Sequence, residues 1–378
     1  MKDNKKLFLL NGINVVVFIF LFSLTISASL INVYKSGNIK LVPDPDFGKG
    51  TEWDLYFPQG IMDMVFAQDG SFFATGFGNK AQHCVYKFDK NGKFIKKIGR
   101  KGRGPGDLYH PGALSILDNK YLIVCEYATS GRISVFDLNG NFVKIIRIKG
   151  NVFDVVGLEN GKFVWLNKKF GMHYSFEVIL SDMTGKTLKV INKFSEKRRN
   201  FSVSPSKYYG EVFIRRNKSG ELIVGFNKAN DVFVYDHEGD LIKKFKLSIK
   251  RREINKKDKE SFYKVMEEQA ERYPMYKRVI ERMYEMNIFP DFTPYYENVK
   301  IDSNNNLLCF TFNDYSKKRN FNVNVYSNKG DYLSSFKINT EYDIESHNFI
   351  KQIFFYNGYI YYPLIKNDGF KLSRFKVR

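Results

Sequence analysis

Cysteine, histidine and tryptophan are scarce: the chain of 378 residues has 3, 5 and 2 of them. The cysteines, Cys84, Cys125 and Cys309, are odd in number and far apart, which argues against a disulfide framework or a zinc site. We expect them to be buried free thiols. No two histidines stand at metal-ligand spacing, and no HExxH or GxSxG motif stands out. The sequence therefore predicts neither a metalloprotease nor a serine hydrolase.

Acidic residues are outnumbered, with 40 Asp and Glu against 60 Lys and Arg, which gives a net charge of +20. A strongly basic chain favours acidic partners such as anionic glycans, lipid headgroups or nucleic acid. The chain is also rich in Lys, Asn, Ile and Phe, a composition that base bias in the gene can produce. The positions of the charges, rather than their total, must therefore identify a binding surface.

Residues 1–28 have the order of a secretory signal peptide. Lysines at the start precede the apolar run Val15–Ile26, and small residues follow around Ala28, where we expect cleavage. The alternative is an uncleaved anchor, because from Leu7 onward the segment is just long enough to span a bilayer. Membrane contact is then expected only through residues 7–28. The sequence predicts an exported protein of the periplasm, cell surface or extracellular space.

A hairpin pattern recurs along the rest of the chain: an alternating strand, Asp or Asn, a turn with glycine, and another strand. The glycines stand 48, 45, 54 and 91 residues apart at Gly92, Gly140, Gly185, Gly239 and Gly330. Glycine suits these turns because it accepts positive φ. A second hairpin precedes each one, with turns near Gly70, Asn119, Gly161, Gly220, Asn305 and Gly358.

Two hairpins per unit make a four-stranded sheet, and a period of 40 to 50 residues with four strands is typical of propeller blades. A β-sandwich would also have regular turns, but it does not require this longer period. We therefore predict an all-β fold, a six-bladed β-propeller of four-stranded antiparallel blades over residues 29–378. The last unit has only three strands before the chain ends, so GNIKLV (37–42) or EWDLYF (52–57) should supply the fourth.

The stretch from Gly99 to Ile116, followed by residues 121–142, resembles the NHL repeat. The matching residues are Gly102, Gly104, Pro105, Gly106, Pro111, Gly112, Arg132, Ile133, Phe136 and Asp137. The resemblance is strong over this blade and weaker over the others. The whole chain is similar to secreted bacterial six-bladed propellers. This resemblance implies a fold and export, and it implies no activity.

One interval between turn glycines, from Gly239 to Gly330, is about 40 residues too long for a blade. The excess, residues 251–290, has apolar residues at helical spacing on both sides of Pro274. We expect two short amphipathic helices between blades four and five. They could cap the propeller, cover a ligand pocket or dock a partner.

Because strands in a blade alternate in direction, both hairpin turns lie on one face of the ring, here called the turn face. The longer connections lie on the opposite face, here called the loop face, and loops on a rigid scaffold often carry function. Basic and aromatic residues crowd these connections, and Arg suits carboxylates while rings suit sugars. The predicted ligand-binding residues are Arg100, Lys101, Arg103, Tyr109, His110, Lys168, His173, Arg198, Arg199, Lys317, Lys318 and Arg319.

The innermost strands contain Asp63 and Asp154, which should line the central channel. Some six-bladed propellers hold calcium or a catalytic metal there, so these two carboxylates could bind calcium. That defines the alternative function, a lyase or lactonase of the propeller type. The glycines of residues 99–106 lie between strands rather than between a strand and a helix, so they do not predict a nucleotide loop.

The sequence as a whole favours a binding or scaffolding propeller rather than an enzyme, with no cofactor required. Its expected partner is an acidic glycan, an acidic peptide or an envelope protein, recognised on the loop face. A nucleic-acid partner is not expected, since an exported protein rarely meets RNA. We expect a monomer.

Overall fold

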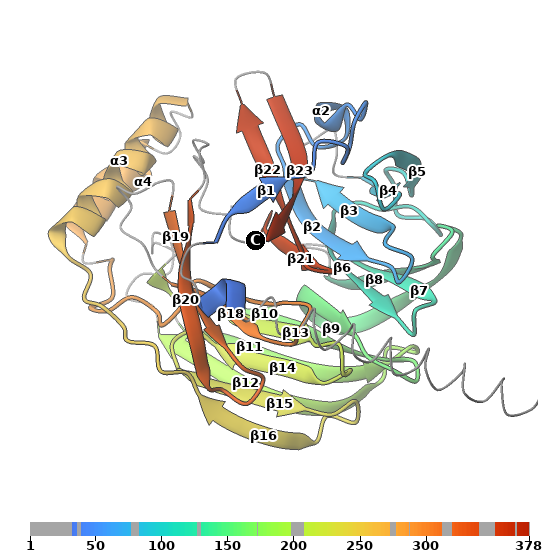
Figure 1. Ribbon diagram of the computed structural model, residues 1–378. Helices are drawn as coiled ribbons and strands as arrows, with labels where there is room; N and C mark the ends of the chain where they lie inside the picture. Colours follow the sequence, from blue (N-terminus) through green and yellow to red (C-terminus); the bar gives the residue numbers. More distant parts are fainter. Residues whose placement is uncertain are drawn as a thin grey trace, which may run out of the picture.

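The computed structural model contains strands throughout, arranged around a ring (Figure 1). It describes residues 32–35, 39–76, 83–126, 130–171, 173–197, 208–272, 277–286, 288–311, 320–339, 352–366 and 369–377. The predicted signal segment, residues 1–28, lies outside this set. Within the described residues, no helix is long and apolar enough to span a bilayer. All three cysteines are buried and free, as predicted.

Four of the five sheets have four strands each. The first contains β2 (Ile61–Phe66), β3 (Phe72–Gly76), β4 (Val85–Phe88) and β5 (Phe94–Ile98). A second contains β13 (Val212–Arg216), β14 (Leu222–Phe226), β15 (Asp231–Tyr235) and β16 (Leu241–Lys246). A third contains β17 (Asn298–Ile301), β18 (Leu307–Thr311), β19 (Asn320–Tyr326) and β20 (Tyr332–Asn339). The last contains β21 (Phe354–Tyr356), β22 (Tyr359–Lys366), β23 (Gly369–Val377) and β1 (Leu41–Pro43).

The fifth sheet has seven strands and departs from the expected separation of blades. It contains β6 (Pro111–Leu117), β7 (Tyr121–Glu126), β8 (Ser130–Asp137), β9 (Phe142–Gly157), β10 (Lys162–Lys169), β11 (His173–Asp182) and β12 (Thr187–Lys197). The long strand β9 pairs with β8 over residues 142–151 and with β10 over residues 152–157. We interpret the sheet as two blade units that share one strand, so that β9 is outermost in one and innermost in the next.

The β-propeller prediction is confirmed. The local structures on which the fold depends are the hairpin turns. Asp137, for example, accepts the backbone N–H of Asn141 at 2.8 Å, and Gly140 has a φ of 84°. The inner turns of neighbouring units also bond to each other. The Gly161 N–H donates to the Asp118 carboxylate at 2.9 Å, and the Lys218 N–H donates to the Asn305 side chain at 2.8 Å. The hairpin turns therefore meet on one face, as the strand directions predict.

The hydrophobic core lies between adjacent sheets, as the alternating strands require. One cluster joins β9, β10 and β11 to β13 and β14 through residues such as Leu166, Phe176 and Val224. At Gly157 the backbones approach so closely that an added Cβ would lie 2.4 Å from the Ile116 carbonyl oxygen. A side chain at this position would push apart the two units that share β9.

The chain's own N-terminal segment closes the ring. Leu41, Val42 and Pro43 pair antiparallel with Val377, Lys376 and Phe375, so GNIKLV supplies the missing strand. The other candidate, EWDLYF, is not a strand: it contains the one-turn helix α2 (Trp53–Tyr56). A helical turn carries Trp53 and Phe57 to the same side, and both are buried between the first and last sheets.

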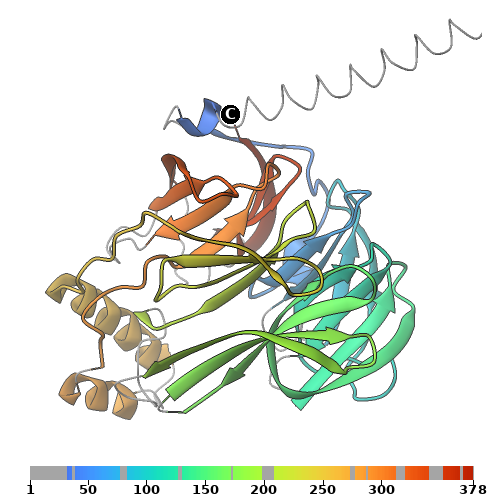
Figure 2. The same cartoon turned by 90° about the horizontal axis from the view of Figure 1, so that it is seen from below.

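The insertion between β16 and β17 forms two helices, α3 (Lys256–Arg272) and α4 (Lys277–Glu285), as predicted. Phe262 of α3 packs with Ile288, Phe289 and Tyr208 in a small core of its own. The Tyr209 hydroxyl, in the connection before β13, donates to the Ile288 carbonyl at 2.9 Å. The helices and the N-terminal residues 32–35 lie on opposite sides of the ring (Figure 2).

Candidate functional site

The connection from β5 to β6, residues 99–110, is the best-defined loop on the loop face, and a buried arginine holds it. The Arg132 guanidinium donates to the carbonyl oxygens of Arg103 at 2.6 Å, Gly104 at 2.9 Å and Asp107 at 3.0 Å. Three carbonyls facing one planar fork fix the loop's course. Gly104 and Arg132, two of the residues that resemble the NHL repeat, are therefore in direct contact.

The charge of Arg132 is balanced by an equally buried carboxylate. Glu126, at the end of β7, lies 2.6 Å from the Arg132 Nε atom, and the side chains are 1% and 9% exposed. The second oxygen of Glu126 accepts the Tyr109 backbone N–H at 3.0 Å. The carboxylate thus ties the end of the loop to the same anchor, which makes the loop a fixed platform.

A cationic and aromatic cluster sits on this platform. The Arg103 guanidinium lies 5.1 Å from the centre of the Tyr109 ring, and the Tyr109 and His110 rings meet edge to face at 4.5 Å. His83, from the connection between β3 and β4, joins them through a 2.6 Å contact between its Nδ1 atom and the Tyr109 carbonyl. The structure therefore brings together three of the predicted residues and adds His83. Sequence spacing could not reveal His83, because it comes from another hairpin.

Two further predicted residues lie on the same loop but are separate from the ring cluster. Arg100 is exposed, and its Nε atom lies 2.9 Å from the Asp107 carboxylate. The hydrogen bond from Arg100 lowers the pKa of Asp107 below its usual value. Lys101 is exposed beside it. Both add positive charge near Arg103, although Asp107 offsets part of it.

Lys168 and His173 come from a different part of the ring. The Lys168 ammonium is buried, lies 2.8 Å from Glu211, and has the rings of Phe153, Phe170, Tyr174 and Phe176 within 5.3 to 5.7 Å. The contacts of this ammonium are therefore with groups of the protein itself, one carboxylate and four aromatic rings. His173 is exposed at the start of β11. Arg198, Arg199, Lys317, Lys318 and Arg319 lie outside the described residues.

The innermost strands carry both signs of charge. Strands β2, β6, β9, β13, β17 and β21 follow one another as neighbours in this order. Asp63 accepts the backbone N–H groups of Leu114 at 2.7 Å and Met64 at 2.9 Å. Burial, and then the charge of Asp154, raise the pKa of Asp63 to about 6. The charge of Asp154, on β9, therefore acts on the other predicted carboxylate, Asp63 on β2.

Cations of this chain already face these carboxylates. Arg215 on β13 lies 3.0 Å from the Asp154 carboxylate, and the charge of Lys300 on β17 lowers the pKa of Asp63. Among the described residues, no group of three or more His, Cys, Asp or Glu side chains is placed to hold a metal ion. Calcium at Asp63 and Asp154 stays a prediction, and Arg215 occupies the position where a cation would balance Asp154.

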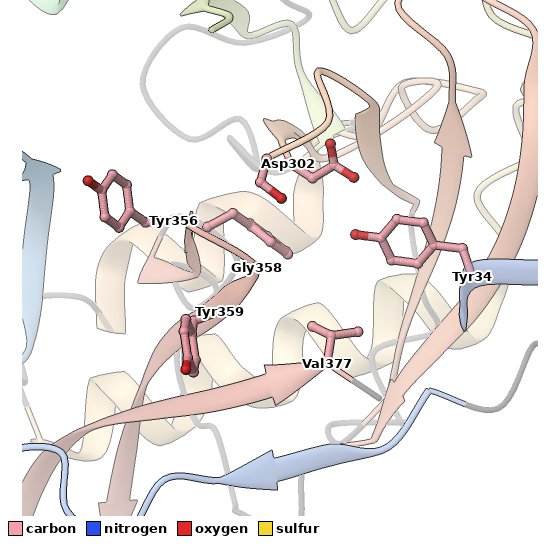
Figure 3. A pocket seen from close by; sticks show the side chains of 8 residues that line it. Tyr34, Asp302, Tyr356, Gly358, Tyr359 and Val377 are labelled. Carbon is pink, nitrogen blue, oxygen red and sulfur yellow. The ribbon is translucent and has the colours of Figure 1, made fainter. Parts of the chain in front are cut away.

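A small depression lies on the turn face, between the third and last of the four-stranded sheets (Figure 3). Tyr34, Asp302, Tyr356 and Gly358 are among its lining residues. Its cavity volume is about 10 Å³, far below the range of roughly 300–1,000 Å³ usual for small-molecule sites. The depression is therefore too small to be a ligand pocket.

Comparison with known proteins supports the fold. Residues 77–216 match the DUF5128 family, described as a 6-bladed β-propeller. A Bacteroides fragilis NCTC 9343 protein, described as predicted to be exported, aligns over 90% of this chain and 94% of its own, with 12% identity and a TM-score of 0.54. A DUF4221-family protein of Bacteroides vulgatus ATCC 8482 aligns over 91% and 99%, with 13% identity and a TM-score of 0.53.

At these identities the structural likeness establishes the β-propeller fold alone. The sequence matches no protein with a curated description. Assignment to the NHL type stays a prediction that rests on residues 99–142.

Proposed function

We propose that this protein is an exported binding propeller that recognises an acidic ligand on its loop face, through Arg103, Tyr109 and His110. The observation that carries the proposal is the Arg103 guanidinium placed over the Tyr109 ring, on a loop that the buried Arg132 and Glu126 hold. A loop fixed in this way loses little conformational entropy when a ligand binds. The site is thus prepared before the ligand arrives.

The residue types indicate the class of ligand. A guanidinium binds a carboxylate through two parallel hydrogen bonds, and the rings of Tyr109 and His110 can support the face of a sugar. Arg100 and Lys101 add attraction at longer range, which speeds encounter with an anion more than it strengthens the complex. These properties fit a carboxylated glycan best, and an acidic peptide or envelope protein would offer the same carboxylates. Residues 1–28 support export of the protein, and an exported protein would meet such ligands.

The proposal is tested with oligogalacturonate, a sugar oligomer with a carboxylate on each ring, as the probe. We expect Arg103→Glu to weaken binding at least about tenfold, because it replaces a charge-assisted contact with repulsion. The matched control is Lys218→Glu, an equal charge change at an exposed position on the turn face, which should change affinity less than about twofold. Titration calorimetry at constant ionic strength measures both. Equal losses in the two variants would contradict a loop-face site.

A second variant, with Lys317→Glu, Lys318→Glu and Arg319→Glu, tests the part of the predicted site that lies outside the described residues. Weaker binding in this variant would extend the site to that connection. Unchanged binding would confine it to residues 99–110. A screen with muropeptides under the same conditions tests whether wall-derived carboxylates are preferred to uronic acids.

The alternative function, a metal-dependent lyase or lactonase, rests on Asp63 and Asp154. Its support is weaker, because Arg215 pairs with Asp154. Metal analysis of the purified protein separates the two functions. Stoichiometric calcium or zinc, lost in an Asp63→Asn variant, would favour the alternative.

A further inference from the structure

A β-bulge follows the outer hairpin turn in each sheet unit that has this turn. In the first sheet, Phe88 pairs with Phe94 and Lys87 pairs with Lys96, so Ile95 between them has no partner. The same shift of register occurs in all five outer hairpins. The unpaired residues, here called the bulge residues, are Ile95, Val143, Leu188, Ile242 and Leu333.

Each bulge residue is a large aliphatic side chain, and four of the five face solvent. Ile95, Val143, Leu188 and Ile242 are 47%, 42%, 42% and 50% exposed. Single exposed apolar residues are ordinary on protein surfaces. Here, however, the same turn-proximal position is apolar and exposed in four consecutive units. Bulges re-aim a side chain that a regular strand would direct elsewhere, so the repeated geometry presents these side chains along the rim of the turn face.

The fifth bulge residue shows what kind of group covers this position. Leu333 is partly buried and packs in a cluster with Val33, Tyr34 and Ile39 of the N-terminal segment. The Tyr34 ring stacks on Phe336 at 5.4 Å, and the Ser334 hydroxyl donates to the Tyr34 carbonyl. At this unit, therefore, an apolar segment of the same chain occupies the rim.

The N-terminal segment that contains Tyr34 also connects the turn face to the apolar start of the chain. Tyr34 lines the depression together with Asp302 and Gly358, two residues of inner turns (Figure 3). Burial, then the charge and a hydrogen bond of Asp302, raise the pKa of the Tyr34 hydroxyl well above its ordinary value. The apolar run Val15–Ile26 ends only eight residues before Tyr34 in the sequence. The chain therefore leads from the most apolar part of the sequence to the turn face of the propeller.

Lysines lie beside the bulge residues. They follow at the next one or two positions, namely Lys96, Lys97, Lys144, Lys189, Lys243 and Lys244. Lys189 pairs with Asp240 and Lys244 pairs with Asp231, so these two charges are offset within the protein. Apolar side chains flanked by lysines are the composition that binds the interface of an anionic bilayer, where apolar area enters the headgroup region and lysines meet anionic lipids.

We propose that the rim of the turn face, formed by Ile95, Val143, Leu188 and Ile242 with their neighbouring lysines, is a contact surface for an anionic lipid bilayer. The sequence alone predicted membrane contact only through residues 7–28, and only if this segment is not cleaved. The bulges add a second contact. In this orientation the loop face points away from the bilayer. The inference is independent of the proposed ligand site, since neither surface shares a residue with the other.

The test uses the full chain in phosphatidylcholine vesicles with 30% phosphatidylglycerol as an anionic surface. A fluorophore on Asn139→Cys reports on the turn face, and one on Phe170→Cys reports on the loop between β10 and β11. Labelling is selective because the native cysteines are buried. We expect quenching by spin-labelled lipid to be at least about threefold stronger at position 139 than at position 170, and to weaken at high salt.

A tether through residues 1–31 could bring the turn face near the bilayer without any contact by the rim, so a second comparison is needed. One variant replaces the four exposed bulge residues with Ser. Its matched control replaces four exposed apolar residues elsewhere with Ser, at Phe170, Tyr284, Met286 and Phe292. All eight positions are exposed, so both variants should fold, which circular dichroism checks. We expect quenching at position 139 to fall at least about twofold in the bulge variant only.

Equal quenching at the two probe positions would overturn the proposal. So would a bulge variant that is quenched as strongly as the wild type. If the bulge variant instead changes the molar mass of the protein in detergent and leaves quenching intact, the rim joins two copies of the chain and the lipid assignment is wrong.

Discussion

Arg132 is the residue on which the loop-face site depends most. It is buried with Glu126 and serves three loop carbonyls at once. Its partner cannot be solvated if the guanidinium is removed, so the remaining charge stays uncompensated. The residue therefore contributes through its position under the site rather than through any contact with a ligand.

We expect Arg132→Gln to lower the free energy of unfolding by about 3–5 kcal/mol, because it leaves a buried carboxylate without its partner. The control is Arg100→Gln, which removes an exposed ion pair and should cost roughly 0–1 kcal/mol. Urea unfolding followed by tryptophan fluorescence measures both. Similar small losses would show that the buried pair does not hold the loop.

Asp63 makes a residue-scale contribution that depends on pH. Its folded pKa of about 6 lies above the ordinary value of 3.8. The folded state therefore keeps a proton that the unfolded chain has released. This contribution to stability is fully present below about pH 4 and is lost as the pH rises through about 6, by up to ~3 kcal/mol.

The change that isolates this effect is Asp63→Asn, which cannot titrate. Relative to the variant, the wild type should lose stability between pH 4 and pH 7, while the carboxylates other than Asp154 contribute equally to both proteins. The measurement is the urea midpoint of each protein across that range. Parallel curves would mean that Asp63 has an ordinary pKa.

At the scale of elements, the hairpins were predictable because their signals are local. An Asp or Asn followed by glycine indicates where a turn lies, and the alternation of apolar and polar residues indicates which strands flank the turn. The sharing of β9 between two units was not predictable, because Gly150 and Asn151, within residues 142–157, are typical of a turn between two separate strands. EWDLYF was one of two candidates for the closing strand because its apolar spacing fits both a short strand and one helical turn.

Closure by the N-terminal segment gives a prediction at this scale. Deleting residues 31–58 should yield an aggregating product, because it removes β1 from the edge of β23 and Phe47, Trp53 and Phe57 from the core. Deleting residues 2–28 leaves these elements in place and should yield soluble protein. Size-exclusion chromatography of both products after refolding is the measurement. Soluble, cooperatively unfolding protein from the first deletion would contradict closure.

At the scale of the whole molecule, the sequence predicted a propeller with two unlike faces, and it predicted only part of the cluster of side chains around Tyr109. Arg103, Tyr109 and His110 meet because they are close in sequence on one fixed loop. Lys168 lies apart from this cluster, and its enclosure by four rings could not be predicted because the rings come from strands that are separated in the sequence. His83 was missed for the same reason. Long-range packing decides which loop charges face solvent, and this packing cannot be read from a single sequence.

In the proposed function, an acidic ligand binds the loop face beside Arg103 and Tyr109. Amide hydrogen exchange with and without saturating oligogalacturonate is the decisive measurement. We expect slower exchange in peptides that cover residues 99–112, with little change in the hairpin turns around Gly92, Gly140 and Gly239. Protection confined to those turns, or protection nowhere when the probe is bound, would contradict it.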